Sequence, residues 1–277
     1  MRVLVTNDDG FDAPGLAVLA RAFADAGHEV VVVAPLTEAS GAGAGIGSLS
    51  QRQGRINVEA VTLPGLEEIP SFAADALPAL IVIAGCLGAF GPPPDLIASG
   101  INPGRNVGRA VLHSGTVGAA LTSVHFRLKG LATSIQAGAP SGYESSNGSL
   151  THFASAAGLA VALASHLETA PSGTVLNLNV PNLPLSEILG VRRAHLATTG
   201  LIYSAGVGEN SPSVQLDLRG EEPAETTVAE ADQTDDTLTE LGWAVVTPLA
   251  SVTEDLRPEV GEVVAAFVHY ASRLVGT

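Results

Sequence analysis

Unbroken apolar, β-branched segments alternate with amphipathic helical patterns in the first part of the chain, and this alternation restricts the fold more than any other feature. Two such segments are RVLVT at 2–6 and EVVVVAP at 29–35. A continuous run of this kind is typical of a strand buried on both faces of a parallel sheet. Between the two runs, Leu16, Leu19 and Phe23 share one helical face. The pattern predicts an α/β fold: a three-layer, Rossmann-like, mostly parallel sheet with helices on both faces.

The same alternation continues to about residue 182 and then changes. Before this point we expect strands at 95–100, 130–136 and 174–180, and helices at 116–128 and near 150–168. After it we expect short strands in 191–220, a solvated acidic segment at 221–240, a returning strand at 243–249 and an amphipathic final helix from Val260 to Leu274. Residues 1–182 are therefore predicted to form the α/β core. Residues 183–277 are predicted to be a β-rich extension used in oligomerisation, not an independent domain.

Charge and composition argue against several classes of protein. The net charge of −15 argues against binding of polymeric nucleic acid, because a phosphate backbone is bound by clustered Lys and Arg. The uncharged stretch 76–94 has fewer apolar residues than the roughly 20 that a membrane span needs, and it is expected to form a buried helix. The single cysteine, Cys86, permits no intrachain disulfide framework, and the first residues form a strand pattern rather than a signal peptide. We therefore expect a cytoplasmic protein with no membrane partner.

Short polar side chains follow three of the predicted strands. They are Asn7, Asp8 and Asp9 after the first strand, Ser40 and Gly41 after the second, and Asn102 and Asn106 after the strand at 95–100. Taken alone, Asn7 to Gly10 would indicate a turn with a helix cap, because Asn, Asp and Gly dominate turns. However, the carboxyl ends of parallel strands meet at one edge of the sheet, where ligands bind. The coincidence at three strand ends therefore favours a binding site.

The predicted site is built of oxygen donors. Two carboxylates, a serine hydroxyl and an amide oxygen suit Mg²⁺, Mn²⁺ or Ca²⁺, whereas zinc prefers Cys and His. The seven histidines are scattered and include no pair at i, i+4. We therefore expect one divalent cation per subunit, Mg²⁺ or Mn²⁺, with Ca²⁺ as a third candidate. One of Asp8 and Asp9 could bind this cation directly, while the other supports it or activates water.

The segment HSGTVGAA at 113–120 supplies small residues where the predicted helix at 116–128 begins. A helix N-terminus presents unpaired amides and the positive end of the helix dipole, so it can hold a phosphate without a basic side chain. An ordinary Ser/Thr cap explains the segment when it is taken alone. Beside a cation site in an acidic protein, Ser114, Gly115 and Thr116 become candidate phosphate ligands.

Three familiar motifs do not occur in the sequence. The glycines of GAGAGIG at 41–47 fit no register of the dinucleotide fingerprint, no Gly-Lys pair forms a P-loop, and no G-x-S-x-G elbow is present. The failed fingerprint disfavours an α/β oxidoreductase or transferase, which remains an alternative at this point.

The chain resembles the SurE family of stationary-phase survival proteins, which are metal-dependent nucleotidases. Four segments carry the resemblance: MRVLVTNDDGFDAPGL, APLTEASGAG, DLIASGINPGRNVG and VLHSGTVGAA. LNLNVPNLP and GWAVVTPL are similar to later segments of the family. The resemblance covers nearly the whole chain and is weaker in 45–75 and 195–235.

The resemblance implies a metal site, an activity and an assembly. The implied metal ligands are Asp8, Asp9, Ser40 and Asn102, and the implied phosphate contacts surround Ser114, Gly115 and Thr116. Family members hydrolyse nucleoside 5′- and 3′-monophosphates, some are broader acid phosphatases, and they form homodimers or homotetramers that exchange C-terminal segments. We therefore expect a divalent-metal-dependent phosphomonoesterase in which Asp8 and Asp9 are catalytic. Asn7, Gly41 and Asn106 are further candidates for substrate binding.

The chain departs from the family pattern at several positions near the predicted site. ALPALI at 76–81 stands where the family has Gly-Thr-Pro-Ala-Asp-Cys, so a hydroxyl and a carboxylate are lost. Other departures are Thr37, Glu38 and Ala39 in place of basic residues, Arg109 in place of an acid, and His113 in place of tyrosine. These changes keep open a different class of function, a nucleotide- or metal-binding regulator with weakened catalysis.

Overall fold

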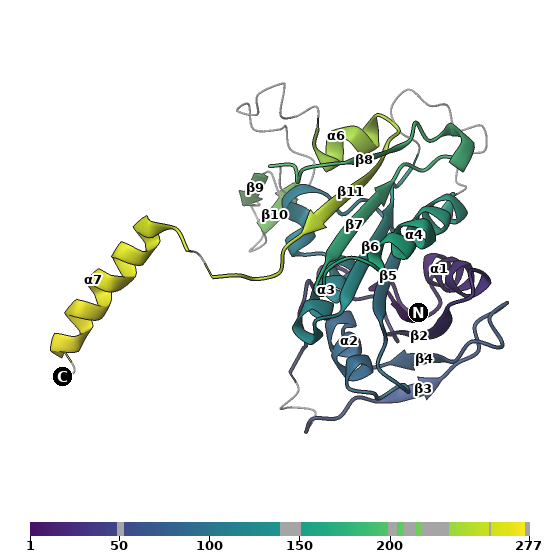
Figure 1. Ribbon diagram of the computed structural model, residues 1–277, viewed down its shortest axis with the longest axis horizontal. Helices are drawn as coiled ribbons and strands as arrows, with labels where there is room; N and C mark the ends of the chain where they lie inside the picture. The colour runs from purple at the N-terminus through teal and green to yellow at the C-terminus, as the bar shows by residue number, and fades with distance from the viewer. Residues whose placement is uncertain are drawn as a thin grey trace.

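The computed structural model has one large sheet with helices on both faces, and a C-terminal helix that stands away from this body (Figure 1). The structure describes residues 1–48, 53–138, 151–198, 204–207, 214–217, 233–254 and 256–274. The predicted α/β class and its mostly parallel sheet are confirmed.

The sheet has nine strands in the order β3-β4-β2-β1-β5-β6-β7-β11-β8. Its strands are β1 (Arg2–Thr6), β2 (Glu29–Pro35), β3 (Val58–Ala60), β4 (Ser71–Ala74), β5 (Leu96–Pro103), β6 (Lys129–Ile135), β7 (Val175–Val180), β8 (Val191–Arg193) and β11 (Ala244–Leu249). The central strands from β4 to β7 pair in parallel, whereas β3 runs antiparallel to β4 and β11 antiparallel to β7. The short strands β3 and β4 were not predicted, because neither has a long apolar run.

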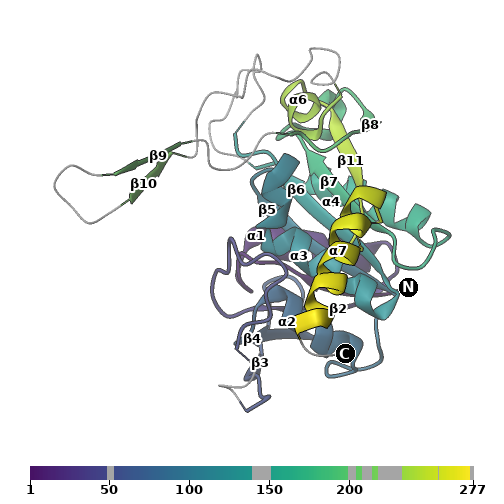
Figure 2. The ribbon, with the colours of Figure 1, turned by 90° about the vertical axis from the view of Figure 1, so that its left-hand side faces the viewer.

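Alternate side chains of the central strands enter two separate cores. Val3 and Val5 pack on one face with α1 (Pro14–Asp25) and α4 (Phe153–Leu167). Leu4 lies on the other face, which α2 (Pro78–Cys86) and α3 (Gly115–Thr122) cover (Figure 2). The buried helix expected in 76–94 is therefore α2. Because both faces are covered, these strands read as unbroken apolar runs in the sequence.

The expected helix at 116–128 is shorter than predicted. After α3 the chain tightens into the 3₁₀ turn η2 (Ser123–Phe126), and Arg127 then takes a left-handed conformation with φ +59°. The apolar period continues through this turn, so the sequence pattern alone did not mark the end of α3. Two other 3₁₀ turns are η1 (Gly108–Leu112) and η3 (Leu185–Glu187).

The C-terminal extension contributes to the main sheet. β11 and β8 extend it beyond β7, and α6 (Asp235–Glu240) packs next to β11. A separate hairpin pairs β9 (Ser204–Val207) with β10 (Val214–Asp217) (Figure 2). The division of the chain at residue 182 stays a prediction. Most of the expected acidic segment lies outside the described residues, but its last part is not solvated as predicted, because Asp235 is fully buried.

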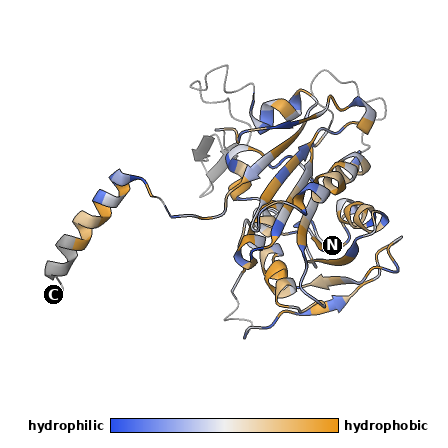
Figure 3. Cartoon of the chain, in the orientation of Figure 1, coloured by the Kyte–Doolittle hydropathy of each residue, from blue (hydrophilic) through white to orange (hydrophobic). Residues whose placement is uncertain are grey.

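The final helix, α7 (Pro258–Leu274), occurs where the apolar period predicts it. Its apolar stripe alternates with polar positions along the ribbon in Figure 3, but the helix lies away from the core (Figures 1 and 3). Val263, Val264 and Phe267 are 70%, 56% and 66% exposed. Within the described part of the chain, none of the helices combines the length and the apolar character that a bilayer span requires.

Candidate functional site

The candidate site lies where the order of the parallel strands reverses. β1 pairs with β2 on one side and with β5 on the other, so the loops after these strands diverge from β1 at one edge of the sheet. Such a switch point forms a crevice at the carboxyl ends of the strands in open α/β sheets. Asn7, Asp8 and Asp9 follow β1, Ser40 and Gly41 follow β2, and Asn102 lies near the end of β5, so all three groups belong to strands that meet at this edge of the sheet.

Asp8 joins the end of β1 to the beginning of α3. Its side chain is almost completely buried, and its Oδ1 accepts a hydrogen bond from the Thr116 hydroxyl. Burial raises the pKa of Asp8, while the hydroxyl of Thr116 and the backbone amides of Thr116 and Gly115 act in the opposite direction. The α3 N-terminus therefore stabilises the ionised form of this buried carboxylate.

Gly115 is required for the close approach of α3 to Asp8. A Cβ at this position would lie 2.7 Å from both Cβ and Oδ2 of Asp8. Ser114 caps the helix in the ordinary way, since its Oγ accepts a hydrogen bond of 3.1 Å from the Val117 amide. The simpler interpretation of the segment, a helix cap, thus applies to the Ser114 side chain. A phosphate contact by the amides at 114–116 stays a prediction.

Asp9 is the ionisable group whose surroundings perturb it most clearly. Its Oδ2 is buried and has no hydrogen-bond partner. Burial, together with the negative charges of Asp8 and Glu38, raises the pKa of Asp9 to about 7. A carboxylate in this environment is destabilised by its neighbours unless it is protonated or a cation is bound.

The loop after β2 brings Ser40 and Glu38 to the two aspartates. The amide of Ala39 donates a hydrogen bond of 2.7 Å to the backbone oxygen of Asp8, which fastens this loop to the end of β1. The Ser40 hydroxyl donates to Oε1 of Glu38 over 2.8 Å. Ser40 and the following Gly41 are exposed, so this part of the site faces solvent.

Asn102 reaches the site through an irregularity in β5. Ser99 pairs with Ala132 of β6 but Asn102 pairs with Ser134, so one extra residue of β5 lies between the two pairs. Gly100 makes this possible, because its φ is +132° and a Cβ there would collide with the backbone oxygen of Thr133. The Asn102 amide group donates 2.6 Å to the Gly104 oxygen, which leaves its Oδ1 as the atom available to a ligand. Bulges of this kind often redirect a side chain next to a functional site.

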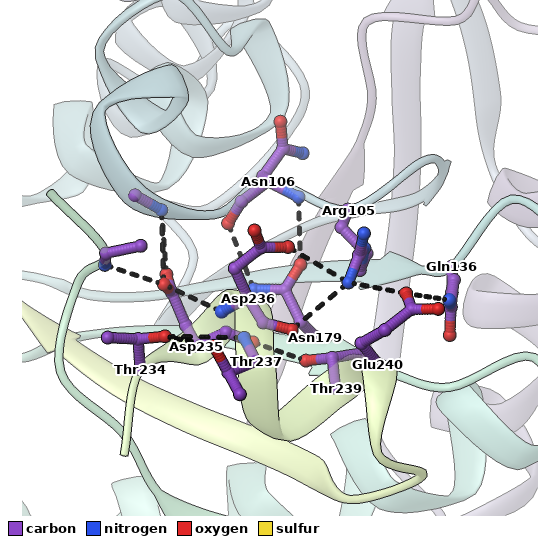
Figure 4. A network of polar contacts seen from close by, with 12 residues as sticks. Arg105, Asn106, Gln136, Asn179, Thr234, Asp235, Asp236, Thr237, Thr239 and Glu240 are labelled. Carbon is purple, nitrogen blue, oxygen red and sulfur yellow. Dashed lines mark hydrogen bonds and ion pairs between the residues drawn. The ribbon is translucent and has the colours of Figure 1, made fainter. Parts of the chain in front are cut away.

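Asn106 is a buried residue of the loop after β5 and is held by two asparagines of β7, of which Figure 4 shows Asn179. Its amide donates 2.8 Å to Oδ1 of Asn179, and its backbone oxygen accepts from the side chains of Asn177 and Asn179. Its own Nδ2 donates 2.9 Å to Ser134. The contacts of this side chain fix the loop, and a substrate contact by Asn106 stays a prediction.

The remaining candidate, Asn7, is fully buried. Its Nδ2 donates 2.9 Å to the Gly10 oxygen and closes the turn after β1, while its Oδ1 has no hydrogen-bond partner. The structure therefore connects the ends of β1 and β2 and the start of α3 by direct contacts. It places Asn102 on the strand next to β1.

Sequence reasoning missed several residues of this region. Glu38 was noted only as a departure from the family pattern, although it bonds to Ser40 and acts on Asp9. Asn177 and Asn179 carried a signal that was available, since two asparagines at i and i+2 of an apolar strand point to the same face. The sequence gives no such signal for Asp235, because this residue lies in a segment rich in acids.

These donors fit a divalent cation. The observation that tests the fit is the buried, unpartnered Oδ2 of Asp9 beside two other carboxylates. Among the described residues there is no cluster of three His, Cys, Asp or Glu side chains that could hold a metal. The candidate ligand set differs from such a cluster, because it combines two aspartates with a serine and an asparagine. Hard oxygen ligands of this kind are those that Mg²⁺, Mn²⁺ and Ca²⁺ prefer.

The fold and the site together define an α/β protein with an oxygen-rich site at a topological switch point. The family model described as "Survival protein SurE" matches residues 3–201. The 5′-nucleotidase SurE of Xanthomonas campestris pv. campestris (strain B100) is 37% identical over 193 residues, which cover 69% of this chain and 67% of that protein. The 5′-nucleotidase SurE of Desulfatibacillum aliphaticivorans is 39% identical over 194 residues, 69% of this chain and 70% of that protein.

Similarity to a solved structure extends further along the chain. The crystal structure of the SurE protein from Aquifex aeolicus superposes with a TM-score of 0.70 at 25% sequence identity, and the match covers 97% of this chain and 100% of that chain. The chain belongs to the SurE family. The resemblance noted from its motifs is thereby confirmed.

The contact between α3 and Asp8 predicts unequal effects for two Gly-to-Ala substitutions in helices. Gly115→Ala places a methyl group against Asp8 and should destabilise the protein by about 1–3 kcal/mol. It should also weaken Mn²⁺ binding, because Asp8 must move. Gly158→Ala in α4 meets no atom within 4 Å and should stabilise by up to about 1 kcal/mol, with unchanged Mn²⁺ binding. Urea unfolding and Mn²⁺ titration measure both effects, and equal behaviour of the two variants would contradict the proposed packing.

The environment of Asp9 predicts a pH-dependent stability of the metal-free protein. Because the pKa of Asp9 is about 7 in the folded state and 3.8 is its ordinary value, the folded protein binds the proton more tightly than the unfolded chain. The free energy of unfolding should therefore fall as the pH rises from about 4 to about 7. Asp9→Asn should show a smaller fall, because burial also raises the pKa of Asp8 and of Asp235, and it should be the more stable protein at pH 8 in EDTA. Thermal unfolding at several pH values checks this, and parallel profiles would contradict it.

Proposed function

We propose that the protein is a divalent-metal-dependent phosphomonoesterase that hydrolyses nucleoside 5′- and 3′-monophosphates to nucleoside and phosphate. The single observation that carries the proposal is the pair of adjacent carboxylates at the switch point of the sheet, the buried Asp8 and the half-buried Asp9, whose Oδ2 is buried without a hydrogen-bond partner. Relatives named 5′-nucleotidase SurE, at 37% and 39% identity, support the nucleotide substrate.

Four residues would hold the cation. Asp8 and Asp9 supply carboxylate oxygens, Ser40 a hydroxyl oxygen and Asn102 its Oδ1. A bound Mg²⁺ or Mn²⁺ would polarise the phosphoryl oxygens and lower the pKa of a coordinated water. It would also offset the negative charge of the substrate in a chain of net charge −15.

The remaining work falls to the residues of the chain. Thr116 and the α3 amides favour the ionised form of Asp8 and fix its position. Asp9 has an oxygen without a hydrogen-bond partner, which suits it to accept a proton from the attacking water. Ser114, Gly115 and Thr116 at the start of α3, with Gly41 of the loop after β2 and Asn106 of the loop after β5, are the proposed contacts of the transferred phosphate. Asn7 supports them by closing the turn after β1.

Phosphate release from a panel of nucleoside monophosphates tests this function. With Mn²⁺ or Mg²⁺ the wild type should release phosphate, and EDTA should abolish the release. Asp9→Asn should lower kcat by about 100-fold or more. Asp25→Asn, which alters an exposed carboxylate on α1, should behave as the wild type. Activity that resists both EDTA and Asp9→Asn would contradict the mechanism.

The same assay decides between catalysis and regulation. The altered 76–81 segment is what keeps regulation open as an alternative. Within it, Leu77 replaces the usual threonine and lies close to Gly45 and Gly47 of the loop after β2. If nucleotides raise the melting temperature with Mn²⁺ present but no phosphate is released, the protein is a nucleotide-binding regulator rather than a phosphatase.

We also propose that the protein is a homodimer or homotetramer in which α7 supplies contacts between subunits. Val263, Val264, Phe267 and Val268 are each more than half exposed, and an apolar stripe of this size is stabilised when it is buried. The double variant Val264→Asp/Phe267→Asp should reduce the mass measured by light scattering to that of a monomer. Glu262→Gln, on the same helix, should keep the mass of the wild type, and an unchanged mass for both variants would contradict the proposal.

A further inference from the structure

We propose that Asp235 of α6 is a positioning residue for the active-site loop, and that the C-terminal extension thereby completes the catalytic site. We define the active-site loop as residues 102–108, which run from Asn102 to the first residue of η1. The inference rests on the proposed function. It concerns a helix outside residues 3–201, the range that the family model matches.

Asp235 is a fully buried carboxylate that binds the end of this loop (Figure 4). Its Oδ2 accepts a hydrogen bond of 3.0 Å from the Gly108 amide, and its Oδ1 accepts one of 2.9 Å from the Ala197 amide. A further amide, that of Asp236, donates 3.0 Å to Oδ1. One side chain thus ties three separate segments together: the active-site loop, the chain after β8 and the start of α6.

The rest of α6 holds the loop at a second point. Arg105 forms ion pairs of 3.0 Å with Asp236 and 3.2 Å with Glu240, and it also donates to the Asp236 backbone oxygen. Glu240 in turn accepts 2.7 Å from Gln136, which follows β6. The loop is therefore bound to α6 at Arg105 and at Gly108, on either side of Asn106.

Two supports from different parts of the chain converge on Asn106. The asparagines of β7 hold its backbone amide and oxygen from the sheet, and Ser134 accepts from its side chain. α6 holds its sequence neighbours. Asn102 precedes residues 105–108 and Ser114 follows them. The path of residues 105–108 therefore determines where the proposed metal ligand Asn102 and the start of α3 lie.

The chemistry of Asp235 favours positioning over simple packing. Burying a carboxylate costs free energy that apolar side chains do not pay, and only directed hydrogen bonds offset it. Apolar packing of α6 is already supplied by Leu238, which is buried beside Trp243 and Val245. Thr239 adds a bond to the Asp235 backbone oxygen, which fixes the residue itself.

Asp235→Asn tests the proposal in the full-length protein. The substitution keeps the shape but replaces one oxygen by an NH₂ group, so that a donor opposes one of the backbone amides. Groups that orient metal ligands typically contribute 10–100-fold to metal affinity or activity. We expect about tenfold weaker Mn²⁺ binding and about tenfold lower kcat with little change in KM. Faster amide exchange is expected in peptides covering 104–112 of the metal-free protein.

Two further variants separate positioning from loss of stability. Leu167→Ala, in the core on the opposite face of the sheet, should lower the melting temperature while Mn²⁺ affinity and exchange in 104–112 stay as in the wild type. Glu240→Gln removes one partner of Arg105 and should act in the same direction as Asp235→Asn, with a smaller effect; it carries the test if Asp235→Asn does not fold.

The outcomes distinguish this inference from the proposed function. If the wild type releases phosphate and Asp235→Asn matches Leu167→Ala in kcat, Mn²⁺ affinity and exchange, the positioning role is refuted. If the wild type releases no phosphate, the proposed function fails. Amide exchange in 104–112 then still decides whether α6 holds the loop.

Discussion

The contact between Asp8 and the first turn of α3 is the interaction on which the geometry of the site depends. A carboxylate buried to this extent needs partners, and it finds them in the Thr116 hydroxyl and in the amides at the start of α3. The contact requires the absence of a side chain at Gly115. The loop after β2 is then fastened to the backbone of Asp8 through Ala39. The contacts of Asp8 thus join three segments that are distant in sequence: the end of β1, the loop after β2 and the start of α3.

Asp9 differs from Asp8, although the two are adjacent. Asp8 has donors, whereas Asp9 has an unpartnered oxygen and two negative neighbours. Burial disfavours the charge of both aspartates, but only Asp8 has hydrogen-bond donors that offset this effect, so the proposed roles differ: Asp8 positions the start of α3, and Asp9 is the group that a bound cation would stabilise most. The asparagines of β7 and the acids of α6 extend the support outward, so that the active-site loop is held from the sheet and from the C-terminal extension.

The sequence predicts the central part of this architecture because burial on both faces leaves unbroken apolar runs, as in EVVVVAP. It also predicts which strands carry the polar residues, since the carboxyl ends of parallel strands share an edge. The bulge at Gly100, the opposition of Gly115 to Asp8 and the burial of Asp235 could not be predicted, because each depends on a contact between distant segments. Local composition even misled for Asp235, since a run of acids ordinarily indicates a solvated surface. The apolar period of α7 predicts the helix, but it does not predict that the apolar face is exposed in the single chain.

The proposed function requires that Asp8, Asp9, Ser40 and Asn102 share one cation. Anomalous diffraction from crystals grown with Mn²⁺ measures this most directly, because it locates the metal independently of any assay. We expect one manganese peak per subunit, at about 2–2.5 Å from oxygens of Asp8, Asp9, Ser40 and Asn102. A peak bound by other residues, or no peak at saturating Mn²⁺, would contradict it.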